Sequence, residues 1–143
     1  MTPSDIPAVN RRLREAFHRT KAPIIDLVAI QTHDPFRVLL GTILSARTKD
    51  ACTAAACGRL FKVVTTPNDL RRISQADLEK IIFPVGFYRD KARHLKALPD
   101  ALEQKFASVL PDTVEALCEL PGVGRKTANL VVALGFGKPA ICV

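Results

Sequence analysis

The sequence predicts an all-α fold of one domain, and three observations support this. Residues that favour helix starts stand before several short apolar runs, which is the local signature of short helices. No segment alternates apolar and polar residues between Asn-Gly or Asp-Gly turns, so a hairpin sheet is not expected. The length of 143 residues corresponds to a single domain that is large enough to bury a hydrophobic core.

The first helix is expected from about Ile6 to Thr20, and it carries a basic cluster, Arg11, Arg12, Arg14 and Arg19. A linker is expected through residues 21–33. Asp34 is then typical of a helix N-cap, and Pro35 of the first helical position. The helix that follows them is apolar on nearly all sides, which places it in the middle of a helical bundle.

Capping residues predict the next helices. One helix is expected over residues 50–61, and two short ones begin after Thr66 and Ser74, each of which is followed three residues later by an aspartate. A longer helical pattern starts near Lys91. Pro99 predicts a kink or a break inside it, because proline removes a backbone donor and clashes with the preceding turn.

The last two expected helices flank a glycine-rich turn. Asp112 and Glu115 indicate the start of a short helix, TVEALCEL, and residues 125–136, RKTANLVVALGF, form the final helix. The total is about eight short helices, with no internal repeat and no low-complexity segment.

Basic residues outnumber acidic ones by 21 to 14, which gives a formal net charge of +7. The excess is uneven, since residues 35–62 are strongly basic and residues 63–83 are balanced. This favours a polyanionic partner, nucleic acid first, although many basic proteins have no such partner. No apolar stretch approaches the roughly 20 residues that cross a bilayer, and no secretory signal is visible. A cytoplasmic protein without a membrane partner is therefore expected.

The four cysteines are expected to be reduced, buried thiols: Cys52, Cys57, Cys118 and Cys142. They form no CxxC motif, and no histidine accompanies them at a spacing typical of zinc sites. No zinc site is therefore expected from these residues.

Residues 120–124, LPGVG, form the most informative turn. Gly122 and Gly124 permit backbone angles and close approaches that a side chain would block. Such a hairpin leaves amide groups unpaired at the start of the next helix, where the helix dipole suits a phosphate. The alternative is a tight turn after a glycine-terminated helix, as many helical proteins have. The adjacent Arg125-Lys126 pair favours the phosphate site.

Lys126 stands in the first helical turn, where a cation faces the positive end of the helix dipole. This position, the neighbouring Arg125 and apolar surroundings would each disfavour a charged ammonium group there. A lysine nucleophile needs a neutral amine, so the placement indicates nucleophilic chemistry. The alternative is a second phosphate-binding cation, and the spacing is compatible with both.

Three segments carry a resemblance to a known family. Residues 120–143 read LPGVGRKTANLVVALGFGKPAICV, residues 35–50 read PFRVLLGTILSARTKD, and residues 84–92 read PVGFYRDKA. The first resembles the helix-hairpin-helix segment of the endonuclease III family, and the others resemble its PFE-LLIAVLLSAQ-T-D and IG-L/F-Y-x-x-K-A segments. The spacing agrees, so the resemblance covers about residues 5–143. Adenine glycosylases commonly have Ser, and alkylbase glycosylases Trp, where this chain has Lys126.

The family consists of bifunctional DNA glycosylases and AP lyases of the HhH-GPD superfamily. The resemblance implies a six-helix barrel domain over residues 22–143, ending in the helix-hairpin-helix of residues 113–136. It implies an N-terminal helix, residues 1–21, which in relatives packs with a C-terminal domain that is missing here. The implied function is base-excision repair of damaged pyrimidines or abasic sites in duplex DNA. A monomer in the cytoplasm, associated with the nucleoid in a prokaryote, is expected.

The resemblance also implies the catalytic group. Lys126 matches the catalytic lysine, which would attack C1′ of the damaged or abasic nucleotide, release the base and form a Schiff base. Proton abstraction at C2′ would then allow β-elimination of the 3′ phosphate. The nucleotide must first leave the base stack, because C1′ is out of reach within the duplex. The residues that match the backbone-gripping hairpin are Gly122, Gly124 and Arg125.

Two further residues match loops that face the lesion in relatives. Arg47 occupies the position of a Gln that fills the gap left by the flipped nucleotide, and Phe87 matches an apolar wedge on the opposite loop. The alternative for Phe87 is an ordinary core aromatic. Backbone carbonyls at three positions match a site for a monovalent cation, Na⁺ or K⁺, in relatives: Cys118, Leu120 and Val123.

The chain departs from the family pattern in two places. The catalytic aspartate belongs to a V-D-x-H motif directly after the segment that matches PAICV, and Val143 stops one residue short of it. The four cysteines of the family's [4Fe-4S] cluster have no match here. We therefore expect an inactive or weakly active fragment without the cluster, which a full-length relative would hold. The alternatives are a non-catalytic helix-hairpin-helix module that binds DNA phosphates and, less favoured, a helical scaffold that binds no DNA.

Overall fold

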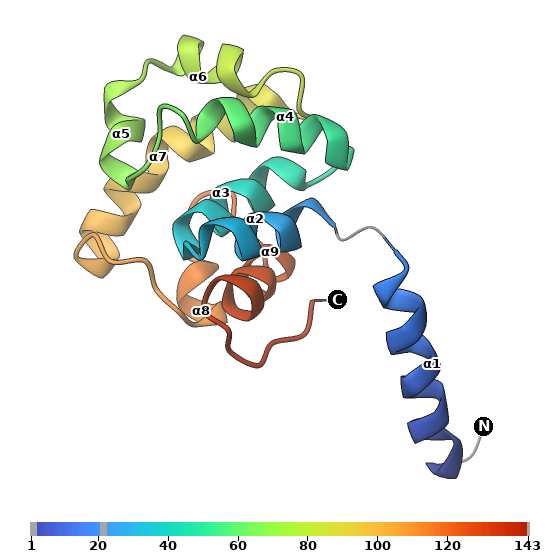
Figure 1. Cartoon of the computed structure of the whole chain (residues 1–143). Helices are drawn as coiled ribbons and strands as arrows, with labels where there is room; N and C mark the ends of the chain where they lie inside the picture. Colours follow the sequence, from blue (N-terminus) through green and yellow to red (C-terminus); the bar gives the residue numbers. More distant parts are fainter. Residues whose placement is uncertain (1–2, 21–22, 143) are drawn as a thin grey trace.

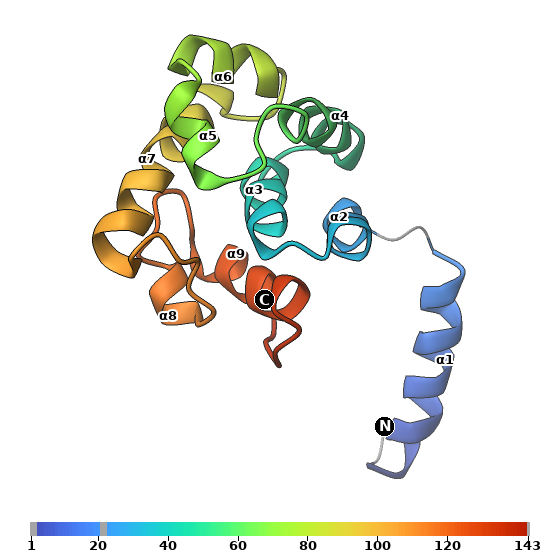
Figure 2. The same cartoon turned by 60° about the vertical axis from the view of Figure 1, so that its left-hand side comes forward.

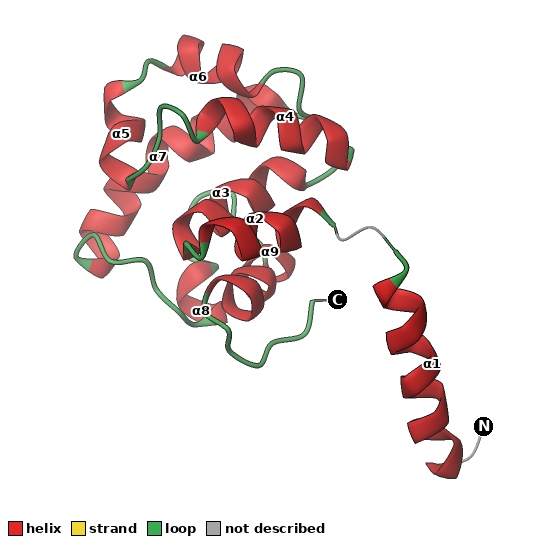
Figure 3. Ribbon diagram, viewed as in Figure 1, coloured by secondary structure: helices red, strands yellow, loops and turns green. Residues whose placement is uncertain are grey.

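The computed structural model describes residues 3–20 and 23–142, which hold helices and loops and no strand (Figure 3). The all-α prediction is therefore confirmed. The helices follow the chain in this order: η1 (Pro3–Asp5), α1 (Ile6–His18), α2 (Ile24–Thr32), α3 (Pro35–Ser45), α4 (Asp50–Leu60), α5 (Pro67–Arg72), α6 (Gln75–Ile82), α7 (Tyr88–Phe106), α8 (Val114–Leu117), α9 (Arg125–Leu130) and the π-helical η2 (Val131–Gly135). None of these helices is long and apolar enough to cross a membrane.

Helix α3 lies at the centre of the molecule, as its apolar sequence predicts. It packs against α2, α4, α7, α9 and η2 (Figure 1). The Asp34 side chain accepts a hydrogen bond from the Phe36 amide at 2.9 Å, which confirms the predicted N-cap. Leu39, Leu40 and Leu44 have no exposed surface. The last residue of this helix, Ser45, accepts a hydrogen bond from the Thr48 amide at 3.0 Å, which ties the α3–α4 loop to the helix.

Helix α2 occupies a segment that the sequence predicts to be a linker, so that prediction is wrong. The segment has no Ser, Thr, Asp or Asn at its N-cap, which is Pro23. Its first amide, that of Ile24, instead donates to the side chain of Asp50 at 3.3 Å. The helix is stabilised by burial of Ile25 against α3, where Gly41 leaves space for the Ile25 side chain.

Helix α1 stands apart from the other helices in Figures 1 and 2. It ends at His18, two residues before the predicted end. Its large apolar side chains are exposed: Ile6, Val9, Leu13 and Phe17. The boundary between residues 1–21 and the barrel domain, and the packing of this helix on a C-terminal domain, stay predictions.

The caps predicted for α5 and α6 are confirmed. The Asp69 carboxylate accepts hydrogen bonds from the amides of Thr65 and Thr66, at 2.9 and 2.8 Å. Ser74 accepts from the amide of Asp77 at 3.1 Å. These hydrogen bonds hold the pKa of the Asp69 carboxyl well below its usual range.

The Asp69 cap makes the stability of the fold dependent on pH. Because the folded state lowers this pKa, the cap stabilises the fold above the ordinary carboxyl pKa of about 4 and loses that contribution as pH falls further. We expect the melting temperature to fall more steeply below pH 4 for the natural chain than for Asp69→Asn. Thermal melts from about pH 6 to pH 2 measure this. Parallel curves would show that the cap does not couple to folding.

Two predictions in the second half of the chain are wrong, the break at Pro99 and the Asp112 cap of α8, while the alternative of a kink at Pro99 stays a prediction. Helix α7 continues through Pro99 without a break, because the helix buries Leu95, Leu98 and Leu102 completely. That burial outweighs the cost of an internal proline, about 3 kcal/mol. Helix α8 is capped by Thr113 rather than by Asp112, which pairs with Lys138.

The final predicted helix is present in two parts. Helix α9 runs to Leu130 and η2 continues it, with the Phe136 amide bonded to the Val131 carbonyl at 3.2 Å. This wider turn brings Gly135 against Pro35, at the start of α3: a Cβ on Gly135 would lie 3.1 Å from the Pro35 Cα. The last helix and the central helix are therefore in close contact.

The four cysteines are free thiols, but the prediction that they are buried holds only in part. Cys57 is buried, and burial raises the pKa of its thiol to about 11. Cys52 is half-buried. Cys118 and Cys142 are exposed, because each lies in a loop beyond the core helices.

Candidate nucleic-acid interface

The turn between α8 and α9 is anchored by Leu120 and Val123, which are buried. The amide of Val123 donates to the carbonyl of Leu120 at 3.2 Å. Between them, Gly122 has φ +75°, a left-handed angle that favours glycine. A Cβ on Gly122 would lie 2.8 Å from Nδ1 and 3.0 Å from Cβ of His94 on α7. The close approach predicted for this glycine is therefore confirmed.

Gly124 is a different case. Its φ of −93° and ψ of 174° suit any residue, so the prediction that it needs a special backbone angle is wrong. Apart from its two neighbours in the chain, no described residue has an atom within 4 Å of the position of a Cβ there. The space that this glycine leaves therefore faces out of the protein. The first α9 hydrogen bond runs from the Ala128 amide to the Gly124 carbonyl at 2.9 Å, so the amides of Arg125 and Lys126 precede it.

Lys126 is exposed and borders a cavity of about 630 Å³. The walls come from the start of α2, the α3–α4 loop and α9, and they include Arg47, Asp26 and Asp50. Sequence reasoning missed both carboxylates, because they reach this place only through the packing of α2 against α3 and α4. The cavity thus joins a primary amine, a guanidinium group and two acidic side chains.

Arg47 and Phe87 face each other from two loops. Each has a left-handed backbone, with φ of 53° and 56°. The Arg47 guanidinium carbon lies 5.5 Å from the centre of the Phe87 ring, which is a cation–π distance. Phe87 is 59% exposed, so the alternative of a core aromatic is wrong. The structure therefore brings together the two residues that the sequence assigned to opposite loops.

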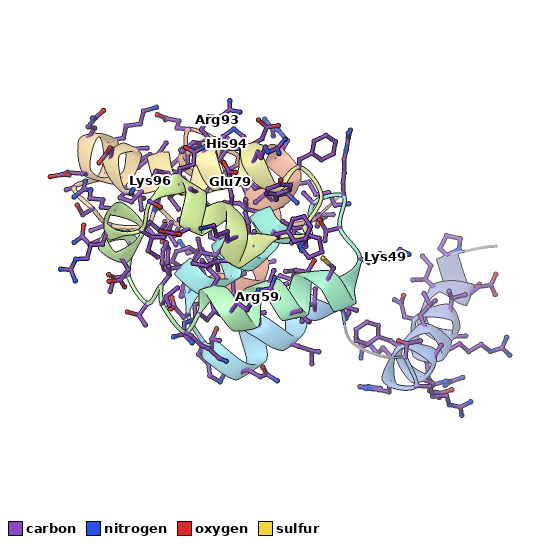
Figure 4. The ribbon with its side chains drawn as sticks, turned by 90° about the horizontal axis from the view of Figure 1, so that it is seen from above. Lys49, Arg59, Glu79, Arg93, His94 and Lys96 are labelled. Carbon is purple, nitrogen blue, oxygen red and sulfur yellow. The ribbon has the colours of Figure 1, made fainter. Side chains whose placement is uncertain are left out.

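A second cavity, of about 280 Å³, connects this pair to the hairpin. Arg47, Phe87 and Gly122 all border it, together with His94 and the buried Lys91. Arg47 borders both cavities and lies between the hairpin side and the Lys126 side. Figure 4 labels His94, which projects from α7 beside Arg93. Four of the six predicted positions thus border the two cavities, namely Lys126, Arg47, Phe87 and Gly122, whereas Gly124 and Arg125 border neither.

Two residues that the sequence reasoning did not single out complete this region. Gly86 lies against the Arg47 loop, since a Cβ on it would be 2.5 Å from the Arg47 carbonyl oxygen. Its amide donates to the Thr48 hydroxyl at 3.0 Å. The glycine of the PVGFYRDKA segment was the available signal for this contact.

The carbonyls of Cys118, Leu120 and Val123 belong to one short turn. Carbonyl oxygens suit a hard cation, and the Leu120 oxygen keeps one lone pair after accepting the Val123 amide. The donor set therefore fits Na⁺ or K⁺, and this site stays a prediction. Within the described part of the chain, no group of three or more His, Cys, Asp or Glu side chains could hold a metal ion.

Comparisons with known proteins identify the family and the fold of this chain. Residues 40–143 match the family described as HhH-GPD superfamily base excision DNA repair protein. Endonuclease III of Thermotoga maritima is 46% identical over 110 residues, which are 77% of this chain and 52% of that protein. Endonuclease III-like protein 1 of Gallus gallus is 35% identical over 133 residues, or 87% and 47% of the two chains. The chain spans about half the length of these curated relatives.

The fold is that of endonuclease III. A structure of a non-covalent endonuclease III–DNA complex superposes with a TM-score of 0.85 at 36% identity, covering 100% of this chain and 64% of that chain. A trapped covalent endonuclease III–DNA intermediate gives the same TM-score, identity and coverage. A thermostable thymine-DNA glycosylase superposes with a TM-score of 0.73 at 25% identity, over 82% and 52% of the two chains.

Proposed function

Because the chain belongs to the HhH-GPD superfamily of base excision DNA repair proteins, we propose that it carries the DNA-binding face and the nucleophile of a DNA glycosylase with AP lyase activity. Its substrates are damaged pyrimidines or abasic sites in duplex DNA. The observation that carries this proposal is the position of Lys126, at the start of α9 and on the wall of a 630 Å³ cavity beside Arg47. Covalent trapping on abasic DNA tests it.

The proposed reaction uses the neutral amine of Lys126. Its nitrogen attacks C1′ of a flipped nucleotide, the bond from C1′ to the base breaks, and the base leaves with a proton. The C1′–O4′ bond then breaks, the ring oxygen takes a proton to become a hydroxyl, and a Schiff base forms between Lys126 and C1′. Removal of a C2′ proton then expels the 3′ phosphate. At an abasic site the amine condenses directly with the sugar aldehyde.

The hairpin is proposed to bind the DNA backbone. The open side of Gly124 and the amides of Arg125 and Lys126 offer donors at a helix start, and Arg125 is an exposed cation beside them. Phosphate contacts fix the position of a protein on the duplex without reading its sequence. Binding through this face is therefore expected on any duplex, with the lesion recognised by other residues.

Salt dependence measures this backbone contact. Each neutralised phosphate lowers the slope of log K against log salt concentration by about 0.9 for duplex DNA. Arg125→Ala should therefore make the slope shallower by about 0.9, for intact and abasic duplexes alike. Arg72→Ala is the matched control, because Arg72 is exposed on α5 and borders neither cavity. An unchanged slope for Arg125→Ala would remove this residue from the backbone contact.

Arg47 and Phe87 are proposed to recognise the distorted site. Both residues border the 280 Å³ cavity, and an exposed aromatic ring can stack where a nucleotide has left the duplex. The guanidinium of Arg47 supplies donors and a flat surface in the same place. This assigns lesion recognition to the α3–α4 and α6–α7 loops.

Phe87→Ala should weaken binding to a duplex with a tetrahydrofuran abasic analogue more than binding to intact duplex. Stacking is worth about 1–3 kcal/mol per base, so the loss should be about fivefold or greater on the analogue alone. Titration by fluorescence anisotropy at one salt concentration measures both. Phe83→Ala is the control, since Phe83 is 56% exposed on the same loop but borders neither cavity. Equal losses on both duplexes would exclude a wedge.

The remaining partners are proposed from the resemblance and the donor chemistry. Na⁺ or K⁺ binds the carbonyl oxygens of Cys118, Leu120 and Val123 and rigidifies the hairpin. A [4Fe-4S] cluster belongs to a longer protein of this family, because the cysteines of this chain do not match the cluster motif. The protein acts as a monomer on DNA in the cytoplasm or nucleoid.

A further inference from the structure

Lys91, near the start of α7, is a buried lysine whose ammonium is satisfied by neutral oxygen atoms. The residue is 7% exposed, and burial lowers the pKa of its ammonium group to about 8. Its Nζ donates to the Leu44 carbonyl at 2.8 Å, the Ala46 carbonyl at 2.6 Å and the Thr48 hydroxyl at 3.2 Å. None of the ion pairs between described residues includes Lys91. Its charge is therefore directed entirely at the end of α3 and the loop behind it.

The three acceptors surround Arg47 in the sequence. Two of them, Ala46 and Thr48, are its direct neighbours. Arg47 itself has φ +53°, a left-handed conformation that costs energy for any residue with a Cβ. The ammonium of Lys91 ties down both sides of this residue, so it opposes relaxation of the loop to an extended backbone.

The same lysine is connected to Phe87. The Lys91 amide donates to the Phe87 carbonyl at 3.0 Å. The Thr48 hydroxyl, which accepts from Lys91 Nζ, also accepts from the amide of Gly86 at 3.0 Å. Lys91 and Thr48 thus link the two loops that carry the cation–π pair of Arg47 and Phe87.

We infer that Lys91 is a positioning residue for lesion recognition, because it holds the Arg47 and Phe87 loops in one fixed arrangement. The inference rests on the proposed function of this face. Lys91 does not touch DNA in this assignment. It acts through the backbone of Arg47 and the Thr48 hydroxyl, and its loss should free both loops without removing either recognition side chain.

Lys96 provides a matched control on the same helix. Its Nζ donates to the carbonyls of Leu70, Arg71 and Ile73 at 3.0, 2.7 and 2.6 Å, at the end of α5. Figure 4 labels Lys96, which lies on α7 beyond His94. Like Lys91, it donates three hydrogen bonds to uncharged oxygen atoms, but it is half-buried and its acceptors border neither cavity. Lys96→Met therefore measures the effect of losing a lysine that binds backbone carbonyls away from the two cavities.

The test compares Lys91→Met and Lys96→Met in the absence of DNA and then on two duplexes. Without DNA, Lys91→Met should accelerate hydrogen exchange of the Thr48 and Gly86 amides by about tenfold or more relative to the natural chain, whereas Lys96→Met should leave them unchanged. On DNA, Lys91→Met should lose about fivefold or more of the preference for the tetrahydrofuran duplex over intact duplex. Lys96→Met should retain that preference. Unchanged exchange at Thr48 and Gly86, or equal effects of the two variants, would overturn the inference.

Thr48→Val tests the coupling of the two loops if Lys91→Met does not fold. It removes the hydroxyl that joins Lys91 to Gly86 but leaves the lysine bound to two carbonyls. It should accelerate Gly86 exchange and lower the abasic preference, and normal values of both would refute the coupling of the loops. A natural chain without any abasic preference would instead refute the proposed function. In that case the exchange measurement still decides whether Lys91 holds the loops.

Discussion

Lys126→Ala should reduce borohydride trapping of the chain on abasic duplex DNA to background. Removal of a catalytic nucleophile commonly lowers the reaction rate by roughly three orders of magnitude or more, and the methyl side chain of alanine cannot form a Schiff base. The measurement is the fraction of labelled DNA that becomes covalently bound to protein in the presence of borohydride. Lys49→Ala is the control, because Lys49 is an exposed lysine of the α3–α4 loop (Figure 4) that borders neither cavity. Persistent trapping in Lys126→Ala would assign the reaction to another amine.

A second substitution at the same position separates the enzyme from a simple DNA-binding module. Lys126→Arg keeps the positive charge, so binding to DNA phosphates should change by less than about twofold. Guanidinium does not act as an amine nucleophile, so trapping should still be lost. A chain that traps no DNA in its natural form, but whose binding falls in Lys126→Ala and recovers in Lys126→Arg, would be a phosphate-binding module.

Base release demands more than Schiff-base formation. A carboxylate must stabilise positive charge on the sugar as the glycosidic bond breaks, and electrostatic stabilisation of this kind is usually the largest contribution. The resemblance assigns that carboxylate to an aspartate after Val143. Residues 1–143 are therefore expected to trap abasic DNA weakly and to release no damaged base at a useful rate. If these residues do release bases, Asp26 and Asp50, which border the Lys126 cavity, are the acids to substitute.

Local signals explain which helices the sequence could predict. The caps of α3, α5 and α6 join residues that are two to four positions apart, so each is visible in a short window of sequence. Helix α2 was missed because the acceptor for its first amide is Asp50, 26 residues away. The break predicted at Pro99 failed for a related reason, since the apolar contacts that stabilise α7 there come from other helices. In both cases the contacts between helices, and not the local helix propensity of the residues, determine the structure.

The site likewise contains residues that the sequence could identify and one whose role depends on contacts between distant segments. The family segments identified Lys126, Arg47 and Phe87, and the structure places them around two adjoining cavities. The segment PVGFYRDKA includes Lys91, and the family pattern has a lysine at that position, but the pattern gives it no role and a single lysine in a polar segment has the appearance of a surface residue. Its role depends on three oxygen atoms that lie 43 to 47 residues earlier in the chain. Such contacts follow from the packing of α7 against α3, which no local pattern encodes.

Gly122→Val and Gly124→Val should separate the two tasks of the hairpin. At Gly122 a β-branched residue meets an unfavourable φ of +75° and a Cβ position 3.0 Å from the Cβ of His94, near the root of that side chain. Rotation of the imidazole ring cannot relieve this contact. The free energy of unfolding should fall by about 3 kcal/mol, and DNA binding should be lost with the hairpin conformation.

Gly124→Val should leave stability within about 0.5 kcal/mol of the natural chain, because the backbone angles suit valine and no protein atom is near. Its side chain would nevertheless occupy the space through which a phosphate reaches the α9 amides, so binding to any duplex should weaken by about tenfold or more. Urea denaturation and anisotropy titration measure the two effects on each variant. His94→Ala combined with Gly122→Ala removes the contacts with the imidazole ring but neither the contact with Cβ of residue 94 nor the unfavourable φ, so it should recover only part of the stability lost in Gly122→Ala. Normal DNA binding by Gly124→Val would place the phosphate elsewhere, since the amides behind an isopropyl group could not reach it.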